Sequence, residues 1–222
     1  MGAQDILFKD SEDIWEQLYQ HPFVQGIATG TLDEDKFRFY LWQDYHYLLN
    51  YARIFSMGVI KSTGNEKAMR AFAFSAYNAL YGEMEIHKSY MARFGITEDM
   101  INQVKPSLLN TSYTSYMLSV ATGEGPAEVV AAITPCALSY GHLARRMVKD
   151  YPDAAKHPLF GEWVDSYASG KYAKANRELC ALQDELAAGY TDKQIAHLSE
   201  IFRTGSLYEL KFWEMAWNKD MN

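Results

Sequence analysis

The stretch KFRFYLWQDYHYLLNYARIF, residues 36–55, determines the fold class. Its apolar side chains recur at intervals of three and four residues, which places them on one face of an α-helix. No run in the chain alternates with the period of two that a half-buried strand needs. The face consists of Phe37, Leu41, Asp44, Tyr47, Leu48, Tyr51 and Phe55. We therefore predict an all-α fold.

Helical spacing continues along the chain and is interrupted by glycine, proline and capping residues. The segment Gly123-Glu124-Gly125-Pro126, for example, places a proline in the first turn of a helix. Neither an internal repeat nor a linker is visible, so we expect residues 1–222 to form one domain, a helical bundle. The predicted helices are 11–20 with a turn near Val24, 33–62, 65–94, 107–121, 126–149, 158–168, 171–188 and 191–217.

Composition limits the classes of partner. The formal net charge is −7 and no run of Lys or Arg exceeds a dipeptide, which argues against nucleic acid as a partner. The chain has 2 cysteines, no start typical of a signal peptide, and no stretch near the roughly 20 apolar residues that cross a bilayer. We expect a cytoplasmic protein that does not contact membranes.

Two carboxylates lie on faces that are otherwise apolar. Asp44 must find a hydrogen-bond partner or change its pKa, and the simpler interpretation is a bond to a tyrosine or arginine across the bundle. Glu209, beside Phe212 and Trp213, has the alternative of a solvated position at the edge of its helix. Two acids among aromatic residues suggest a pocket for a cationic or hydrogen-bonding heterocycle.

A proline precedes a cysteine inside the predicted helix at residues 126–149. Pro135 has no N–H, so it leaves the carbonyl of Ala131 without its helical donor and bends the helix. We predict that this bend turns Cys136 into a cavity, facing Tyr47. A small side chain packed in the core is the alternative for Cys136, and it is the interpretation that we adopt for Cys180.

A metal site was also considered. Glu83 and His87 are four residues apart on one helical face, and other helices offer further ligands. The paired Glu-x-x-His signature of iron-binding bundles is absent, and a single Glu/His pair at this spacing more often forms a hydrogen bond. We expect no metal and no cofactor. The further ligands considered are Asp44, His46, His142 and Glu209.

Five segments together resemble the TenA family of thiaminase II enzymes, the aminopyrimidine aminohydrolases. They are FRFYLWQDYHYL, NTSYTSYM, ITPCALSYGHLARRM, WVDSYAS and SLYELKFWEMAW, in this order, between Phe37 and Trp217. The resemblance implies a fold similar to heme oxygenase and a homotetramer. It also implies hydrolysis of aminomethylpyrimidine to hydroxymethylpyrimidine in thiamine salvage, and of thiamine to hydroxymethylpyrimidine and the thiazole alcohol.

The same resemblance implies roles for individual residues. Cys136 is the nucleophile, Glu209 is the acid that donates a proton, and Tyr47 increases the nucleophilicity of the cysteine. The implied substrate-binding residues are Asp44, Tyr140, Tyr113 and Tyr167. These residue types suit the reaction, because a thiolate can attack an electron-poor pyrimidine when an acid protonates the ring.

Two other functions stay open on the sequence. One is a metal- or heme-dependent oxidase with the same helical fold, which would bind iron or heme. The other is a non-catalytic regulator that binds the pyrimidine without converting it.

Overall fold

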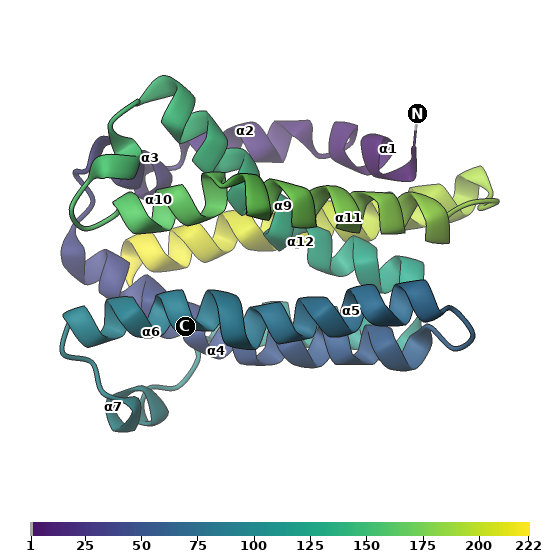
Figure 1. Ribbon diagram of the computed structural model, residues 1–222, viewed down its shortest axis with the longest axis horizontal. Helices are drawn as coiled ribbons and strands as arrows, with labels where there is room; N and C mark the ends of the chain where they lie inside the picture. The colour runs from purple at the N-terminus through teal and green to yellow at the C-terminus, as the bar shows by residue number, and fades with distance from the viewer. Residues whose placement is uncertain (1) are drawn as a thin grey trace.

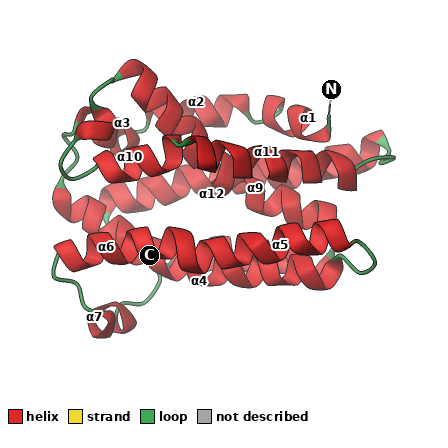
Figure 2. Cartoon of the chain, in the orientation of Figure 1, coloured by secondary structure: helices red, strands yellow, loops and turns green. Residues whose placement is uncertain are grey.

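The computed structural model describes residues 2–222, and within them every regular element is a helix, as Figure 2 shows. The predicted all-α fold is therefore confirmed. The α-helices are α1 Ala3–Lys9, α2 Glu12–Gln20, α3 Pro22–Thr29, α4 Glu34–Lys61, α5 Glu66–Asn78, α6 Met84–Arg93, α7 Glu98–Gln103, α8 Leu108–Gly123, α9 Pro126–Asp150, α10 Gly161–Ala168, α11 Gly170–Leu186 and α12 Asp192–Asn218. A π-helical segment, η1, spans Ala79–Glu83, and a short 3₁₀ helix, η2, spans Ala154–Lys156.

The helices form a layered bundle (Figure 1). Helices α9 and α12 cross its middle and pack against each other. Helices α4, α5 and α6 lie along one side of this pair, and α1 and α2 lie along the opposite side, with α10 and α11 in front of α9. In the described part of the chain, no helix is both long and apolar enough to cross a membrane.

Capping residues set the helix starts that the sequence predicted. The Asp33 carboxylate accepts the backbone N–H of Asp35 at 2.8 Å and so begins α4. Thr191 and Gln194 form a capping box that begins α12. The observed bounds of both helices lie within two residues of the predicted ones.

Four helices differ from the prediction. The turn expected near Val24 is helix α3, and short helices α1 and α7 form where none was predicted. Helix α10 begins at Gly161 rather than at residue 158, because Nδ1 of His157 accepts the backbone N–H groups of Leu159 and Phe160, each at 3.2 Å. These two hydrogen bonds hold the chain in a turn before the helix starts.

The predicted helix at residues 65–94 contains a π-helical turn. In η1 the N–H of Met84 bonds the carbonyl of Ala79, five residues earlier, so one more residue occupies the turn than in an α-helix. Gly82 lies in this turn, and a Cβ atom there would be 2.8 Å from Oδ1 of Asn78. Glycine therefore makes room for the Asn78 side chain at this bend.

The central helix α9 runs through Pro135 without ending. It packs closely on α12 at that point, since a Cβ atom on Gly205 would be 2.7 Å from Cγ of Pro135. Glycine at position 205 thus allows α12 to accept the proline ring. The contact holds the middle of α9, and with it Cys136, at a fixed depth in the bundle.

Candidate active site

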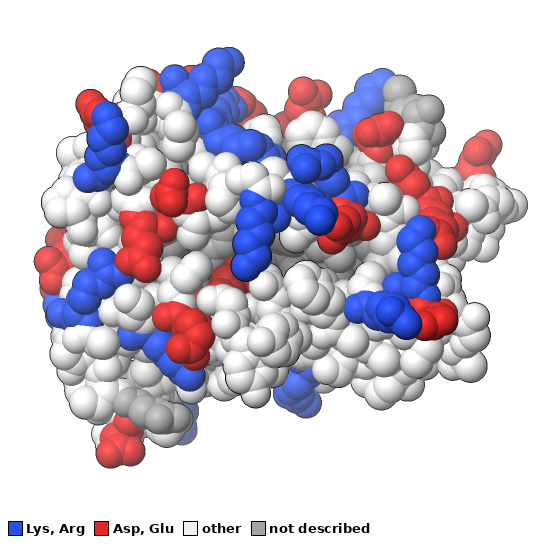
Figure 3. Space-filling model, viewed as in Figure 1, with Lys and Arg blue, Asp and Glu red and all other residues white. Residues whose placement is uncertain are grey.

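A cavity lies between α4, α5, η1, α9 and α11 and widens toward α6 and α10. Its inner part has a volume of about 80 Å³ and its outer part about 420 Å³. Small-molecule sites usually have roughly 300–1,000 Å³, so the outer part alone has the size of such a site. The two parts share the lining residues Phe74, Asn78, Glu83, Tyr172, Ala175 and Glu178. The face in Figure 3, toward which the outer part opens, has acidic and basic side chains interspersed.

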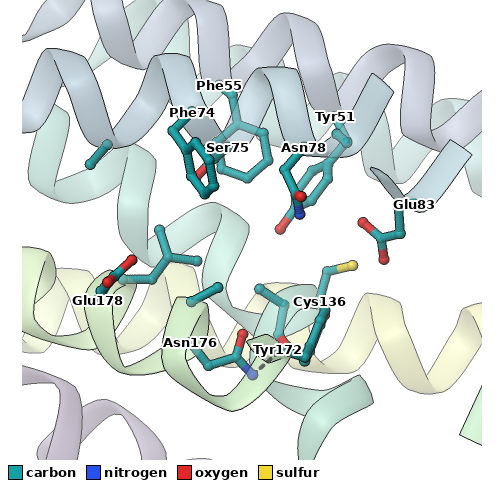
Figure 4. Close-up of a pocket in the computed structure, with 15 residues that line it drawn as sticks. Tyr51, Phe55, Phe74, Ser75, Asn78, Glu83, Cys136, Tyr172, Asn176 and Glu178 are labelled. Atoms are coloured by element: carbon teal, nitrogen blue, oxygen red, sulfur yellow. Dashed lines mark hydrogen bonds between the residues drawn. The ribbon is translucent and has the colours of Figure 1, made fainter. Parts of the chain in front are cut away.

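Cys136 lies in the wall of the inner part, with 7% of its surface exposed. In Figure 4 its Sγ points toward the carboxylate of Glu83. Burial raises the pKa of the thiol well above its ordinary value, and the charges of Glu209 and Glu83 add to this. Hydrogen bonding with the Tyr47 hydroxyl, which also donates to Sδ of Met117 at 3.8 Å, acts in the opposite direction. Cys136 thus lies beside Tyr47 and in the wall of a cavity.

Side chains from two neighbouring helices bind the backbone around Cys136. The Tyr51 hydroxyl on α4 donates to the carbonyl of Ile133 at 2.7 Å, and Nδ2 of Asn176 on α11 donates to the carbonyl of Ala137 at 2.9 Å. The Ala131 carbonyl has no helical donor, because Pro135 carries no N–H. The turn with the cysteine is therefore held from both sides of the cavity.

Glu209 is 2% exposed and lies beside Cys136. The Tyr113 hydroxyl donates to its Oε1 at 2.7 Å. Burial raises the pKa of Glu209 to about 8, although the hydrogen bonds from Tyr113 and Cys136 lower it and the charge of Asp44 raises it further. At neutral pH this carboxyl group mostly keeps its proton, so it can donate one inside the bundle. A solvated position for Glu209 does not describe this structure.

Asp44 is 4% exposed and binds two partners. Its Oδ2 lies 2.5 Å from Nε2 of His87 and accepts the Tyr40 hydroxyl at 3.2 Å. Nδ1 of His87 lies 3.0 Å from the carbonyl of Glu83, so both ring nitrogens face oxygen acceptors. Burial by itself lowers the pKa of His87, but Asp44 and the carbonyl of Glu83 outweigh it and the net pKa is raised. Asp44 is therefore held by the Tyr40 hydroxyl and by an imidazole whose other nitrogen is fixed on the Glu83 carbonyl.

The predicted pocket tyrosines lie around the same centre. Tyr167 lines the outer part of the cavity, and its ring centroid is 4.9 Å from that of Tyr140. Tyr47 and Tyr113 have centroids 5.4 Å apart. The structure therefore brings all seven predicted residues together around one cavity, but most of them lie behind its wall rather than on its surface.

Sequence reasoning missed three residues that line the cavity: Tyr51, Glu83 and Tyr172. Tyr51 was visible in the sequence, one helical turn after Tyr47 on the same apolar face. Glu83 was considered only as a metal ligand with His87. In the described part of the chain, no group of three or more His, Cys, Asp or Glu side chains is placed to hold a metal ion. His87 instead contacts Asp44 and the carbonyl of Glu83 in the core, as in the hydrogen-bonded alternative to a metal site.

Comparisons with known proteins identify the family of the chain. The model of the TENA/THI-4/PQQC family matches residues 8–219. The aminopyrimidine aminohydrolase of Halalkalibacterium halodurans is 39% identical over 222 residues, which are 100% of this chain and 98% of that protein. The solved structure of a TenA homologue from P. horikoshii is 30% identical and has a TM-score of 0.86, with 98% of this chain and 99% of that chain covered.

The fold also extends beyond close relatives. A domain from Shewanella denitrificans with a heme oxygenase-like fold has a TM-score of 0.74 at 14% identity, and covers 97% of this chain and 92% of that chain. At this level of identity the likeness concerns the fold alone. The predicted similarity to the heme oxygenase fold is confirmed.

Proposed function

The chain belongs to the TENA/THI-4/PQQC family, and on this premise we propose that it is an aminopyrimidine aminohydrolase of thiamine salvage, with Cys136 as its nucleophile. It hydrolyses aminomethylpyrimidine to hydroxymethylpyrimidine. The similarity to the Halalkalibacterium halodurans aminohydrolase over the whole chain supports this reaction. Thiamine, which carries the same pyrimidine, is its second substrate.

One observation supports the proposal: the thiol of Cys136 lies in the wall of the inner part of a cavity, and the buried carboxyl group of Glu209 lies directly beside it. Cys136 adds as its thiolate to the pyrimidine carbon beside a ring nitrogen, and Glu209 protonates that nitrogen as negative charge develops. The electron-rich adduct then expels the group on the exocyclic methylene. Water adds to the methylene carbon, and the thiolate leaves as the ring becomes aromatic again.

The remaining predicted residues bind and position. The side-chain oxygens of Asp44, held by His87, accept the hydrogens of the exocyclic amine of the pyrimidine. Tyr47 stabilises the thiolate through its hydroxyl. Tyr140, Tyr113 and Tyr167 surround the ring and exclude water.

The covalent step is tested by Cys136→Ser with Cys180→Ser as the matched control. Cys180 is half-buried on α11, and it does not line the inner or the outer part of the cavity. We expect the first variant to lose at least about a thousandfold in ammonia release from aminomethylpyrimidine, because a serine hydroxyl is a much weaker nucleophile than a thiolate. The control should hydrolyse it like the wild type. Near-normal turnover by Cys136→Ser would contradict the covalent mechanism.

The proposal also includes a cytoplasmic location and assembly into a homotetramer. Exposed aromatic residues on α5 and η1, namely Phe74, Tyr77 and Tyr81, support a contact between subunits. Light scattering of the purified protein tests the assembly, and a mass of one subunit would contradict it.

A further inference from the structure

Two acids that line the cavity, Glu83 and Glu178, have no role in the steps described above. Glu178 is exposed and lies 3.9 Å from Nζ of Lys174, which leaves Glu83 as the acid to explain. Glu83 lines both the inner and the outer part of the cavity, so it lies where the part that contains the thiol meets the larger part. The π-helical turn places it there, as the last residue of η1. π-Turns inside helices often occur at functional sites.

The contacts of Glu83 leave it free to act on a ligand. The Tyr167 hydroxyl donates to its Oε1 at 2.9 Å and fixes the carboxylate in place. Figure 4 shows this carboxylate facing the sulfur of Cys136 across the cavity. A group beside the thiol also lies beside the reacting methylene, because the ring carbon that the thiol attacks is bonded to the carbon that bears the methylene.

The other two acids are committed elsewhere. Glu209 keeps its proton at neutral pH and serves the ring nitrogen, and Asp44 is paired with His87. A protonated acid is a poor base for water. The carboxylate of Glu83 is the one that remains for the exocyclic methylene.

We propose that Glu83 is the catalytic base that takes a proton from the attacking water, an inference that rests on the proposed function. The substrate enters with its aminomethyl group as an ammonium ion beside the Glu83 carboxylate. When the C–N bond breaks, its electron pair leaves with nitrogen as ammonia. The water oxygen then bonds to the methylene carbon, and one proton of the water passes to Glu83.

The remaining electrons and protons balance. The electron pair of the exocyclic double bond returns to the ring, the Cys136 thiolate leaves, and the ring nitrogen returns its proton to Glu209. Glu83 gives its proton to the departing ammonia or to water in the outer part of the cavity, which it also lines. The net products are hydroxymethylpyrimidine and ammonium.

The environment of Glu83 suits this task. Burial raises its pKa to about 7, and the charge of Asp44 raises it further, while His87 and the hydrogen bond from Tyr167 lower it. A base with a pKa near the working pH can both accept and release a proton at useful rates.

The test uses the whole enzyme with Glu83→Gln, and Glu85→Gln as the matched control. Glu85 is exposed, two residues further along the same helix. We expect Glu83→Gln to release ammonia from aminomethylpyrimidine about 10²–10⁴-fold more slowly, the usual contribution of a general base. It should still bind hydroxymethylpyrimidine in a calorimeter. Glu85→Gln should match the wild type.

Chemical rescue separates a base from a structural support. Azide bonds to the methylene carbon without losing a proton, so sodium azide should restore ammonia release by Glu83→Gln and yield azidomethylpyrimidine. Glu209→Gln should not be rescued, because its ring nitrogen still lacks the proton. In the wild type, the pH profile of kcat/KM should have an acidic limb near pH 7, and Glu83→Gln with azide should lack it.

Several outcomes would overturn the inference. Hydrolysis by Glu83→Gln within about threefold of the wild type would do so, as would a folded variant that binds product but gains nothing from azide. If Glu83→Gln does not fold, Glu83→Asp takes its place. Azide should then accelerate this variant, whose shorter carboxylate is misplaced, and no acceleration would overturn the inference. A wild type that releases no ammonia would instead contradict the proposed function itself.

Discussion

Replacing Glu209 by glutamine should stabilise the protein, and more at high pH than at low pH. The folded protein raises the pKa of this buried carboxyl group from 4.5 to about 8. Between these two values the folded state keeps a proton that the unfolded chain has released. The stability of the wild type therefore falls as the pH rises through this window, and Glu209→Gln removes that loss.

The size of the effect follows from the two pKa values. At about 1.4 kcal/mol per pH unit, the penalty is about 1.4 kcal/mol at pH 5.5 and about 4.6 kcal/mol at pH 8.5. The gain from the substitution should thus be about 3 kcal/mol larger at pH 8.5. A typical domain has only about 5–15 kcal/mol of stability, so this difference is readily measured. Glutamine can still accept the hydrogen bond from the Tyr113 hydroxyl. Any loss of stability that does not depend on pH cancels when the gain at pH 5.5 is subtracted from the gain at pH 8.5.

Urea unfolding followed by far-UV circular dichroism at both pH values measures the difference. Glu66→Gln is the control, because Glu66 is exposed and pairs with Arg70, which is charged at both pH values, so its replacement should have the same effect at both. The histidines titrate alike in wild type and variant, so their contributions largely cancel. An equal gain at both pH values, or a loss at pH 8.5, would refute the reasoning.

Three further substitutions test packing, the thiol and the buried ion pair. Gly205→Ala places a Cβ atom 2.7 Å from the Pro135 ring and should lower the free energy of unfolding in urea by about 1–3 kcal/mol. The second substitution Pro135→Ala should restore part of this loss. Full stability of Gly205→Ala alone would count against the close contact. Tyr47→Phe removes the hydrogen bond that lowers the pKa of Cys136, so iodoacetamide should alkylate the thiol about tenfold more slowly at pH 8. An unchanged alkylation rate would speak against that bond. His87→Leu leaves a buried carboxylate unpaired and should cost about 3–5 kcal/mol, and an unchanged melting temperature would exclude the pair as a stabilising contact.

The long helices could be predicted because each of them buries one face along many turns. Twenty or more residues of α4 and of α12 repeat the spacing of a buried face, and Asp33 and Thr191 mark their starts. Helices α1 and α7 have 7 and 6 residues, too few for a period to emerge. They depend on contacts made after folding, such as the bond from the Gln4 N–H to Asp184 at 2.9 Å.

The site was predictable where a polar side chain interrupts an apolar face. Asp44, Cys136 and Glu209 were found in this way, and all three are buried around the cavity. Their roles came from the resemblance to the family and remain proposals. Glu83 gave no such signal, because a period of 3.6 assumes a regular α-helix and η1 breaks that period directly before it. The side chain of Glu83 points into the cavity because of the π-helical backbone of η1, and the spacing of apolar residues does not predict a π-turn.

The π-turn η1 changes the direction in which the side chains of α6 point relative to those of α5. One additional residue in a helix rotates everything after it by about 100° relative to everything before it. Phe74 and Asn78 of α5 therefore line the cavity, while Met84 and His87 of α6 point into the core. Without this additional residue, Met84 and His87 would be turned by the same angle away from the core, so the π-turn lets one continuous helix line the cavity with α5 and pack into the core with α6.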